Sequence, residues 1–189
     1  FVELGQGWAY LFYDMVDRFQ ILMYALAALG NTPGTWTAAE CFAPGGSASG
    51  YAVPSQTLLP TLLRWQLLFE DPFTQTLWLA RATPRTWLAN GKRVALTGAP
   101  TSYGRLTFSL QSTSVSTVHG NVTLGVNFQW PPGGLVLRLR SPHFPTRKIT
   151  AVSIGGAKCN TFNGTAETVT IATAPQSLVA LQHIIATLA

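Results

Sequence analysis

Seven carboxylates are the side chains of this 189-residue chain with the most obvious use in acid/base chemistry: Glu3, Asp14, Asp17, Glu40, Glu70, Asp71 and Glu167. Two carboxylates can hydrolyse a glycoside when they lie about 5 Å apart for retention, or about 6.5–9.5 Å apart for inversion. Glu70 and Asp71 stand at the predicted end of a helix, and Glu167 is predicted to start a strand. We therefore expect Glu40 and Asp17 to be the catalytic residues.

Glu40 lies in a long stretch that has no apolar periodicity and contains many Pro and Gly residues. Trp36 and Tyr51 lie in the same stretch. A carboxylate beside aromatic rings is typical of a sugar site, because rings stack on sugar faces and the acid serves the glycosidic oxygen or a hydroxyl. Trp36 and Tyr51 are therefore predicted to bind substrate. The alternative is that Glu40 caps a helix or pairs with an arginine.

Other acids leave room for alternatives. Asp14 is spaced to pair with Arg18 on a helix, whereas Glu3 could replace Asp17 as the partner of Glu40. The decisive acid could also lie in helices that precede this sequence, because the chain begins at Phe1 and enters an aromatic helix at once. We expect the chain to be a piece of a longer polypeptide, or to need a partner chain that completes the helical part.

Metal and cofactor chemistry have little support in the sequence. The three histidines, His119, His143 and His183, are far apart, and neither a zinc pattern nor a Cys-His pair is present. Gly45-Gly46-Ser47 lacks the flanking strand and the lysine of a phosphate-binding loop. We expect no metal and no cofactor.

The composition limits the class of protein. Hydrophobic residues make up 47% and aromatic residues 11%, so the chain can bury a core. Only 10% of residues are charged, against roughly 25% in typical soluble domains. The net charge is +5, but the Lys and Arg residues are scattered without interleaved aromatics, so we expect no nucleic-acid partner.

Helical and sheet patterns follow one another along the chain. Residues 8–29 repeat apolar side chains at steps of three and four, and residues 57–69 are predicted to form a further, interior helix whose start Thr57 can cap. Residues 105–111 and 122–128 alternate apolar and polar side chains, as strands do, and the last segment, residues 177–188, is expected to be a strand. The turns expected between strands include Asn90-Gly91 and His119-Gly120, and Pro84–Leu88 is expected to form a short helical turn. Because the two patterns are segregated, the sequence predicts an α+β fold: a helical part over residues 1–75, with a long loop at 31–56, and an antiparallel β-sandwich over residues 76–189.

Sequons and cysteines bear on the compartment. Asn121-Val-Thr and Asn163-Gly-Thr are N-glycosylation acceptors, and they favour a secreted, extracellular glycoprotein. Cys41 and Cys159 could form one disulfide between the two parts, or could be free or bridge to other segments. The most apolar run, residues 21–29, is about half the length of a membrane span, so we expect none.

Two stretches carry a family resemblance: LLPTLLRWQLLFEDP, followed by LWLARATPRTWLANGKRVALTGAPTSYGRLTFSL. They resemble the end of the helical toroid and the start of the C-terminal β-sandwich in secreted proteins of the six-hairpin, or (α/α)6-barrel, glycosidase-like superfamily. RLRSP, ITAVSIGGAKCNTFN and ETVTI are similar to the continuation of that sandwich. A common hairpin of the family, V-x-V-N-G-K-x-W, departs here to VSIGGAKC.

The resemblance implies a carbohydrate partner without choosing a reaction, because its motifs are structural. We expect the C-terminal portion of a secreted carbohydrate-active enzyme, with a glycoside hydrolase favoured over a polysaccharide lyase. The alternative is a non-catalytic extracellular glycoprotein that uses the same scaffold to bind glycans or to assemble with other proteins.

Overall fold

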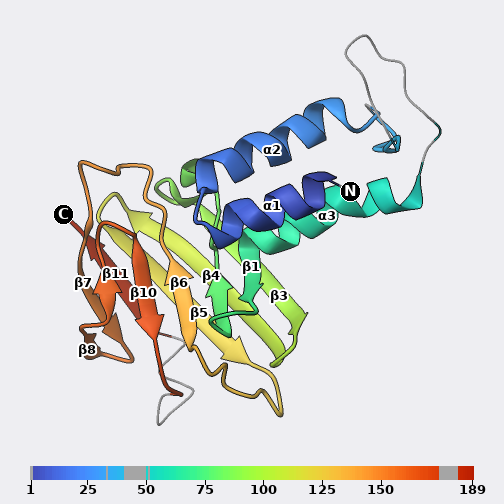
Figure 1. Ribbon diagram of the computed structural model, residues 1–189. Helices are drawn as coiled ribbons and strands as arrows, with labels where there is room; N and C mark the ends of the chain where they lie inside the picture. The colour runs from blue at the N-terminus through green and yellow to red at the C-terminus, as the bar shows by residue number, and fades with distance from the viewer. Residues whose placement is uncertain (1, 33, 41–49, 51, 175–182) are drawn as a thin grey trace. The chain divides into compact units, whose positions relative to one another are not determined.

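The computed structural model describes residues 2–32, 34–40, 50, 52–174 and 183–189. The chain folds into two compact units, a helical unit of residues 1–66 and a β unit of residues 67–189 (Figure 1). Helices come first and strands follow, which confirms the α+β prediction. The boundary lies earlier than residue 75, because Leu68–Asp71 forms a strand that pairs with Thr76–Leu79.

The helical unit contains α1 (Val2–Phe12), α2 (Val16–Leu29) and α3 (Val53–Leu67), of which the last residue belongs to the β unit. The apolar stripe of residues 8–29 is thus divided between two helices. The break falls at Asp14, whose φ of 57° is left-handed and cannot continue a helix. Leu11 and Phe19, one on each side of the break, are both fully buried.

Helix α3 begins and ends earlier than predicted. Thr57 does not cap its start, because the Thr57 hydroxyl donates a hydrogen bond to the Pro54 carbonyl at 2.7 Å, within the first turn of the helix. Pro60 therefore lies inside the helix. The expectation of an interior helix was also too strong, because Leu63 is exposed and only one apolar residue of α3, Leu62, is buried among those described.

The β unit contains two sheets. The five-stranded sheet has the order β1 (Leu68–Asp71), β2 (Thr76–Leu79), β6 (Leu135–Arg138), β10 (Thr168–Ile171) and β9 (Phe162–Asn163). Its neighbours are antiparallel except β2 and β6, which are parallel.

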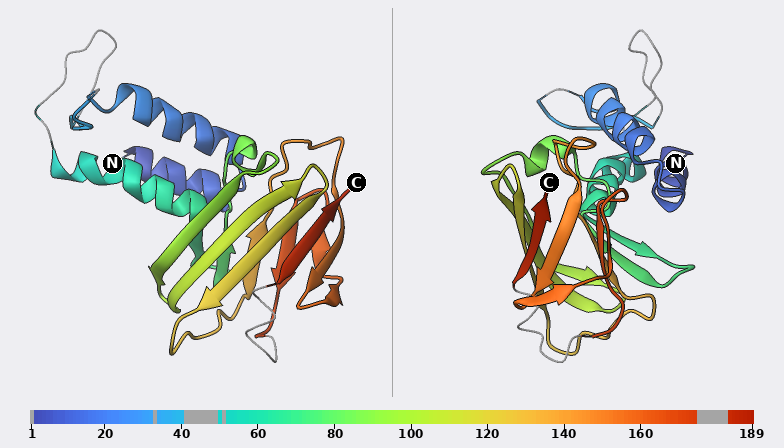
Figure 2. Two further views of the ribbon diagram at one scale, coloured as in Figure 1. Left: turned by 180° about the vertical axis from the view of Figure 1, so that it is seen from behind. Right: turned by 90° about the vertical axis from the view of Figure 1, so that its left-hand side faces the viewer.

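The six-stranded sheet is antiparallel throughout. Its order is β3 (Arg93–Thr101), β4 (Gly104–Ser114), β5 (Thr117–Leu124), β11 (Ile184–Leu188), β7 (Ile149–Ile154) and β8 (Ala157–Cys159). The C-terminal segment, predicted as a strand over residues 177–188, is a strand over its described part. It lies between β5 and β7 (Figure 2, left, red).

One hydrophobic core is shared by both sheets. Leu77, Leu137 and Val169 come from the five-stranded sheet, and Phe108 and Val152 come from the six-stranded sheet. In β4 the buried apolar residues stand at every second position, and so do the buried residues of β5: Leu106, Phe108 and Leu110, then Val118, Gly120 and Val122. Two sheets around one core are what the sandwich prediction requires.

Strand β5 differs from the prediction at both ends. It ends at Leu124, and Val126, predicted to be an inward strand residue, is 92% exposed. His119-Gly120, predicted as a turn, lies inside the strand. Gly120 occupies an inward position where a Cβ atom would lie 3.2–3.3 Å from Leu137, Ile184 and Leu110, so even one added carbon would be tight against the packed core.

Candidate functional site

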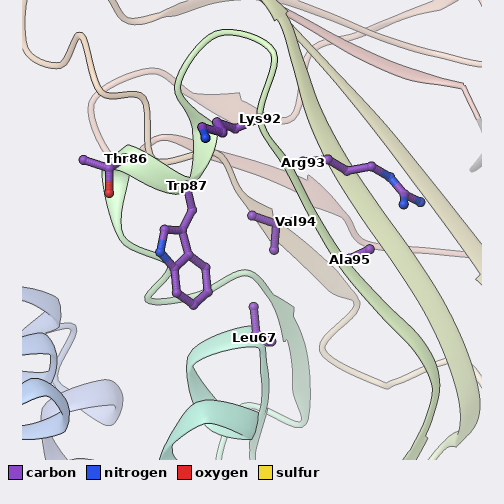
Figure 3. A pocket seen from close by; sticks show the side chains of 7 residues that line it. All are labelled: Leu67, Thr86, Trp87, Lys92, Arg93, Val94 and Ala95. Atoms are coloured by element: carbon purple, nitrogen blue, oxygen red, sulfur yellow. The ribbon is translucent and has the colours of Figure 1, made fainter. Parts of the chain in front are cut away.

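An open groove of about 580 Å³ lies on the β unit, and we call it the Trp87 groove (Figure 3). It is lined by an indole, a hydroxyl, two cationic side chains and three apolar side chains: Trp87, Thr86, Lys92, Arg93, Leu67, Val94 and Ala95. None of these residues is acidic. In Figure 3 the Trp87 ring points toward Leu67, and the Arg93 guanidinium is directed away from the indole.

Local sequence positions the groove. Pro84 precedes a 3-10 helix, η1 (Arg85–Leu88), and its carbonyl accepts a hydrogen bond from the Trp87 N–H at 3.0 Å. The predicted Asn90-Gly91 turn follows, with Gly91 at φ 78°, where glycine is favoured. This turn leads the chain into β3 and brings Lys92 and Arg93 to the same groove as Trp87.

A buried ion pair fixes η1 to the rest of the β unit. Arg85 Nη1 lies 2.9 Å from Glu167 Oε2, and the Glu167 side chain is only 3% exposed. Glu167 Oε1 also accepts a hydrogen bond from the Ser141 N–H at 2.8 Å, and Arg85 donates to the Ser141 carbonyl at 2.7 Å. The Arg85 guanidinium lies 4.7 Å from the centre of the Phe144 ring. Glu167 is therefore a structural acid.

A second groove, of about 410 Å³, lies on the six-stranded sheet, and we call it the His119 groove. Most of its lining side chains are uncharged and polar or are imidazoles; the lining residues are Gln111, Thr113, His119, Gly120, Asn121, His183, Ile184 and Ile185. The predicted turn at 119–120 would have separated these residues. The continuous β5 strand instead places His119 opposite Ile185 and beside His183 in one groove.

The predicted catalytic residues are at the surface of the helical unit. Glu40 is exposed, and its N–H donates to the Gly50 carbonyl at 3.2 Å. Asp17 is exposed in the first turn of α2. Trp36 is 59% exposed and has a left-handed φ of 55°. Tyr51 lies outside the described residues, and the meeting of Glu40 and Asp17 at one site stays a prediction.

Glu70 and Asp71 belong to β1 and are not a helix end. Asp71 Oδ1 accepts hydrogen bonds from the Phe73 N–H at 2.9 Å and the Thr74 N–H at 3.2 Å, so Asp71 stabilises the turn between β1 and β2. Glu70 Oε2 accepts from the Ser102 N–H at 2.9 Å. Burial raises the pKa of the Tyr103 phenol, and the negative charges of Glu70 and Asp71 raise that pKa further.

Both predicted glycosylation sites are exposed. Asn121 lies on β5 in the His119 groove. Asn163 lies at the end of β9, where its Oδ1 accepts hydrogen bonds from the Thr165 N–H at 3.0 Å and the Ala166 N–H at 2.9 Å. Glycosylation of either residue stays a prediction.

The predicted Cys41–Cys159 disulfide also stays a prediction, because Cys41 lies outside the described residues. Cys159 Sγ lies 3.3 Å from the Thr161 hydroxyl oxygen, and no disulfide joins it to another described residue. In the described part of the chain no three His, Cys, Asp or Glu side chains gather as metal ligands would. None of the helices within the described ranges has both the length and the hydropathy of a membrane span.

Charge is divided unequally between the two units. Residues 67–189 contain ten Lys and Arg against three Asp and Glu, a formal charge of +7. Residues 1–66 contain two Lys and Arg against four Asp and Glu, a formal charge of −2. The sequence prediction treated the cations as scattered. The signal that it missed is the complete lack of acids between Asp71 and Glu167.

Comparison of the chain with models of known protein families, with curated proteins and with solved structures gave no match. The function is therefore argued from the grooves, the acids and the charge of the molecule itself.

Proposed function

We propose that the β unit is a carbohydrate-binding module of an extracellular carbohydrate-active protein, and that the Trp87 groove is its binding site. The observation that carries this proposal is the lining of the groove. An indole, the Thr86 hydroxyl and two cations surround one open space without an acid. An indole offers a flat apolar face to a sugar ring, and the hydroxyl and the Lys92 ammonium offer hydrogen bonds that orient it.

Binding suits the β unit better than catalysis, because its three acids all have structural partners. Glu167 is buried in its ion pair with Arg85, Asp71 accepts two hydrogen bonds of a turn, and Glu70 accepts one from Ser102. Glycoside hydrolysis needs a general acid and a second carboxylate that both face the substrate. Those carboxylates would have to come from another part of the protein.

The helical unit is the place for a second candidate function, glycoside hydrolysis. The exposed ring of Trp36 in the same segment as Glu40 favours it, because such a ring is free to stack on a sugar beside the carboxylate. On this proposal the helical unit is the end of an (α/α) toroid. Ile21, Tyr24 and Leu29 of α2 are exposed apolar residues that further toroid helices would cover.

The test of the first proposal is direct binding of neutral and acidic oligosaccharides to the 189-residue chain. Tryptophan fluorescence and calorimetry measure the binding. We expect Trp87→Ala to weaken binding about tenfold or more, the equivalent of about 1.4 kcal/mol. Trp130→Ala is the matched control, since Trp130 is likewise a partly buried indole that packs against the core of the β unit, but it lines neither groove. Equal loss of binding in both variants, or no loss in Trp87→Ala, would overturn the assignment.

Trp87 also packs against the core of the β unit, so its truncation could act through stability. Thr86→Ala provides a second variant, because Thr86 is exposed and lines the same groove. We expect it to weaken binding while the melting temperature stays that of the parent chain. Unchanged affinity in Thr86→Ala, together with unfolding of Trp87→Ala, would count against the groove.

A further inference from the structure

One residue from each strand of the six-stranded sheet forms a single row across it. The residues are directly opposite one another in the register of adjacent strands: Arg93 (β3), Gln111 (β4), His119 (β5), Ile185 (β11), Ser153 (β7) and Lys158 (β8). Directly opposite residues point to the same face of a sheet. We call this set the outer row.

The outer row faces away from the core. In five of the six strands the row residue has a buried neighbour along the strand, as Val94 beside Arg93, Val118 beside His119 and Val152 beside Ser153 show. In β8, Cys159 beside Lys158 is partly buried and packs against the core. Arg93, Gln111 and Lys158 are exposed. The face of the sheet that carries the row is seen in the left view of Figure 2, where β3 is green and β11 is red.

The length of the row follows from strand spacing. Neighbouring strands lie about 4.8 Å apart, so the five steps from Arg93 to Lys158 span roughly 24 Å. A cation stands at each end. Between them lie an amide, an imidazole and a hydroxyl, which are hydrogen-bonding groups, and the apolar side chain of Ile185. Such a row is long enough for several consecutive units of an extended chain, and too long for one small molecule.

Both grooves of the β unit lie on this row. Arg93 lines the Trp87 groove, and Gln111, His119 and Ile185 line the His119 groove. One lining residue of each groove, Arg93 and Gln111, belongs to the same register pair. A ligand that lay along the row would pass the His119 groove and would end beside the Trp87 groove at Arg93.

The positive charge of this face favours the binding of an anionic ligand. No Asp or Glu occurs in any of the six strands, whereas Arg105 on β4 adds a further exposed cation to those of the row. The β unit as a whole carries +7. A surface lined by one sign of charge raises the local concentration of oppositely charged partners and speeds their association.

We propose that the outer row binds an extended anionic polysaccharide, with carboxylate or sulfate groups, that lies across the strands. The inference rests on the proposed carbohydrate-binding function and names the class of ligand. Single-stranded nucleic acid is the other polyanion to consider, but its binding relies on aromatic side chains on which bases stack. The outer row contains no phenylalanine, tyrosine or tryptophan.

The first test compares three polysaccharides and single-stranded DNA on the full chain by affinity electrophoresis and calorimetry. We expect dextran sulfate to bind, unsulfated dextran to bind at least tenfold more weakly, and rising salt to weaken the sulfated complex because mobile ions screen its charges. Polygalacturonate, a carboxylated chain, separates the two kinds of anion. Equal binding of dextran and both anionic polymers, or stronger binding of single-stranded DNA than of either anionic polysaccharide, would overturn the proposal.

The second test locates the site with two variants that remove the same charge. Arg93→Gln/Lys158→Gln takes the cations from both ends of the row. Arg147→Gln/Lys148→Gln takes two cations from the segment before β7, and Lys148 lies five residues, about 17 Å of strand, from Ser153. We expect the first variant to weaken dextran sulfate binding about 3- to 20-fold, and the second to weaken it less than twofold.

Similar losses in the two double variants would mean that net charge alone attracts the polymer, and the outer row would then be no site. Failure of this inference can be told from failure of the proposed function. If dextran sulfate does not bind but Trp87→Ala still abolishes binding of another sugar, only the outer row is wrong. If dextran sulfate binding depends on Arg93 and Lys158 but not on Trp87, only the Trp87 groove is wrong.

Discussion

Arg85 and Glu167 are 82 residues apart in the sequence and form a buried ion pair, with Arg85 Nη1 2.9 Å from Glu167 Oε2. The pair joins η1 to the turn before β10, and Glu167 also accepts a hydrogen bond from the Ser141 N–H. It therefore fixes the 3-10 helix that carries the Trp87 groove. Arg85 is partly exposed, so the contribution is smaller than that of a fully buried pair.

Glu167→Ala is expected to destabilise the β unit by about 1.5–3 kcal/mol, the usual contribution of hydrogen bonds to a charged group. The measurement is the midpoint of unfolding by denaturant, monitored by tryptophan fluorescence. Glu40→Ala is the control, because Glu40 is an exposed acid of the helical unit and its loss should change the midpoint little. A stability of Glu167→Ala equal to that of the control would contradict the structural role.

Gly120→Val is expected to destabilise the β unit by about 1–3 kcal/mol, since added side-chain atoms would overpack the core beside Leu110, Leu137 and Ile184. Gly5→Ala is a control with the opposite expected sign. Gly5 lies in α1 with no atom within 4 Å of an added Cβ, and alanine favours a helix over glycine by about 1 kcal/mol. Thermal unfolding measures both. A tolerated Gly120→Val would contradict the inward position of this residue.

Removing the sequon at Asn121 is expected to strengthen binding of dextran sulfate in protein from a glycosylating host, because a glycan at this position would cover the His119 groove. Thr123→Ala removes the acceptor sequence and keeps Asn121. We expect an increase of about threefold or more in affinity. Thr165→Ala, which removes the acceptor sequence at Asn163, should leave affinity unchanged. Mass spectrometry of the parent chain checks occupancy, and an unmodified Asn121 would show the glycosylation prediction to be wrong there.

Glu40→Gln tests the second candidate function on plant and microbial polysaccharides. If Glu40 is the general acid or base, turnover should fall about 10²- to 10⁴-fold, whereas folding should be unaffected because Glu40 is exposed. Asp17→Asn should cause a comparable loss if it is the partner, and Asp14→Asn serves as the control. Hydrolysis at the parent rate in Glu40→Gln would remove Glu40 from the reaction.

Much of the secondary structure could be predicted from the sequence. The alternation of Leu106, Phe108 and Leu110 identified β4, and the Asn90-Gly91 and Pro84–Leu88 signals identified the turn and the 3-10 helix beside the groove. These signals are local, because side-chain alternation follows from the two-residue repeat of a strand and turn residues follow from their own φ preferences.

Predictions failed where a neighbour in space decides the structure. Leu68–Asp71 reads as the end of a helix until β2 pairs with it. His119-Gly120 reads as a turn, yet Gly120 is needed because Leu110 and Ile184 pack against it.

The sequence by itself determined the α+β order, the inward faces of the main strands and the charge of each segment. Only the tertiary structure decided that β11 lies between β5 and β7 and that Arg85 forms an ion pair with Glu167. It also decided that Arg93 and Lys158 stand at the two ends of the outer row. The reason is physical: periodicity specifies which face of a strand is buried. Strand order and register depend on pairing between distant segments, which no local pattern records.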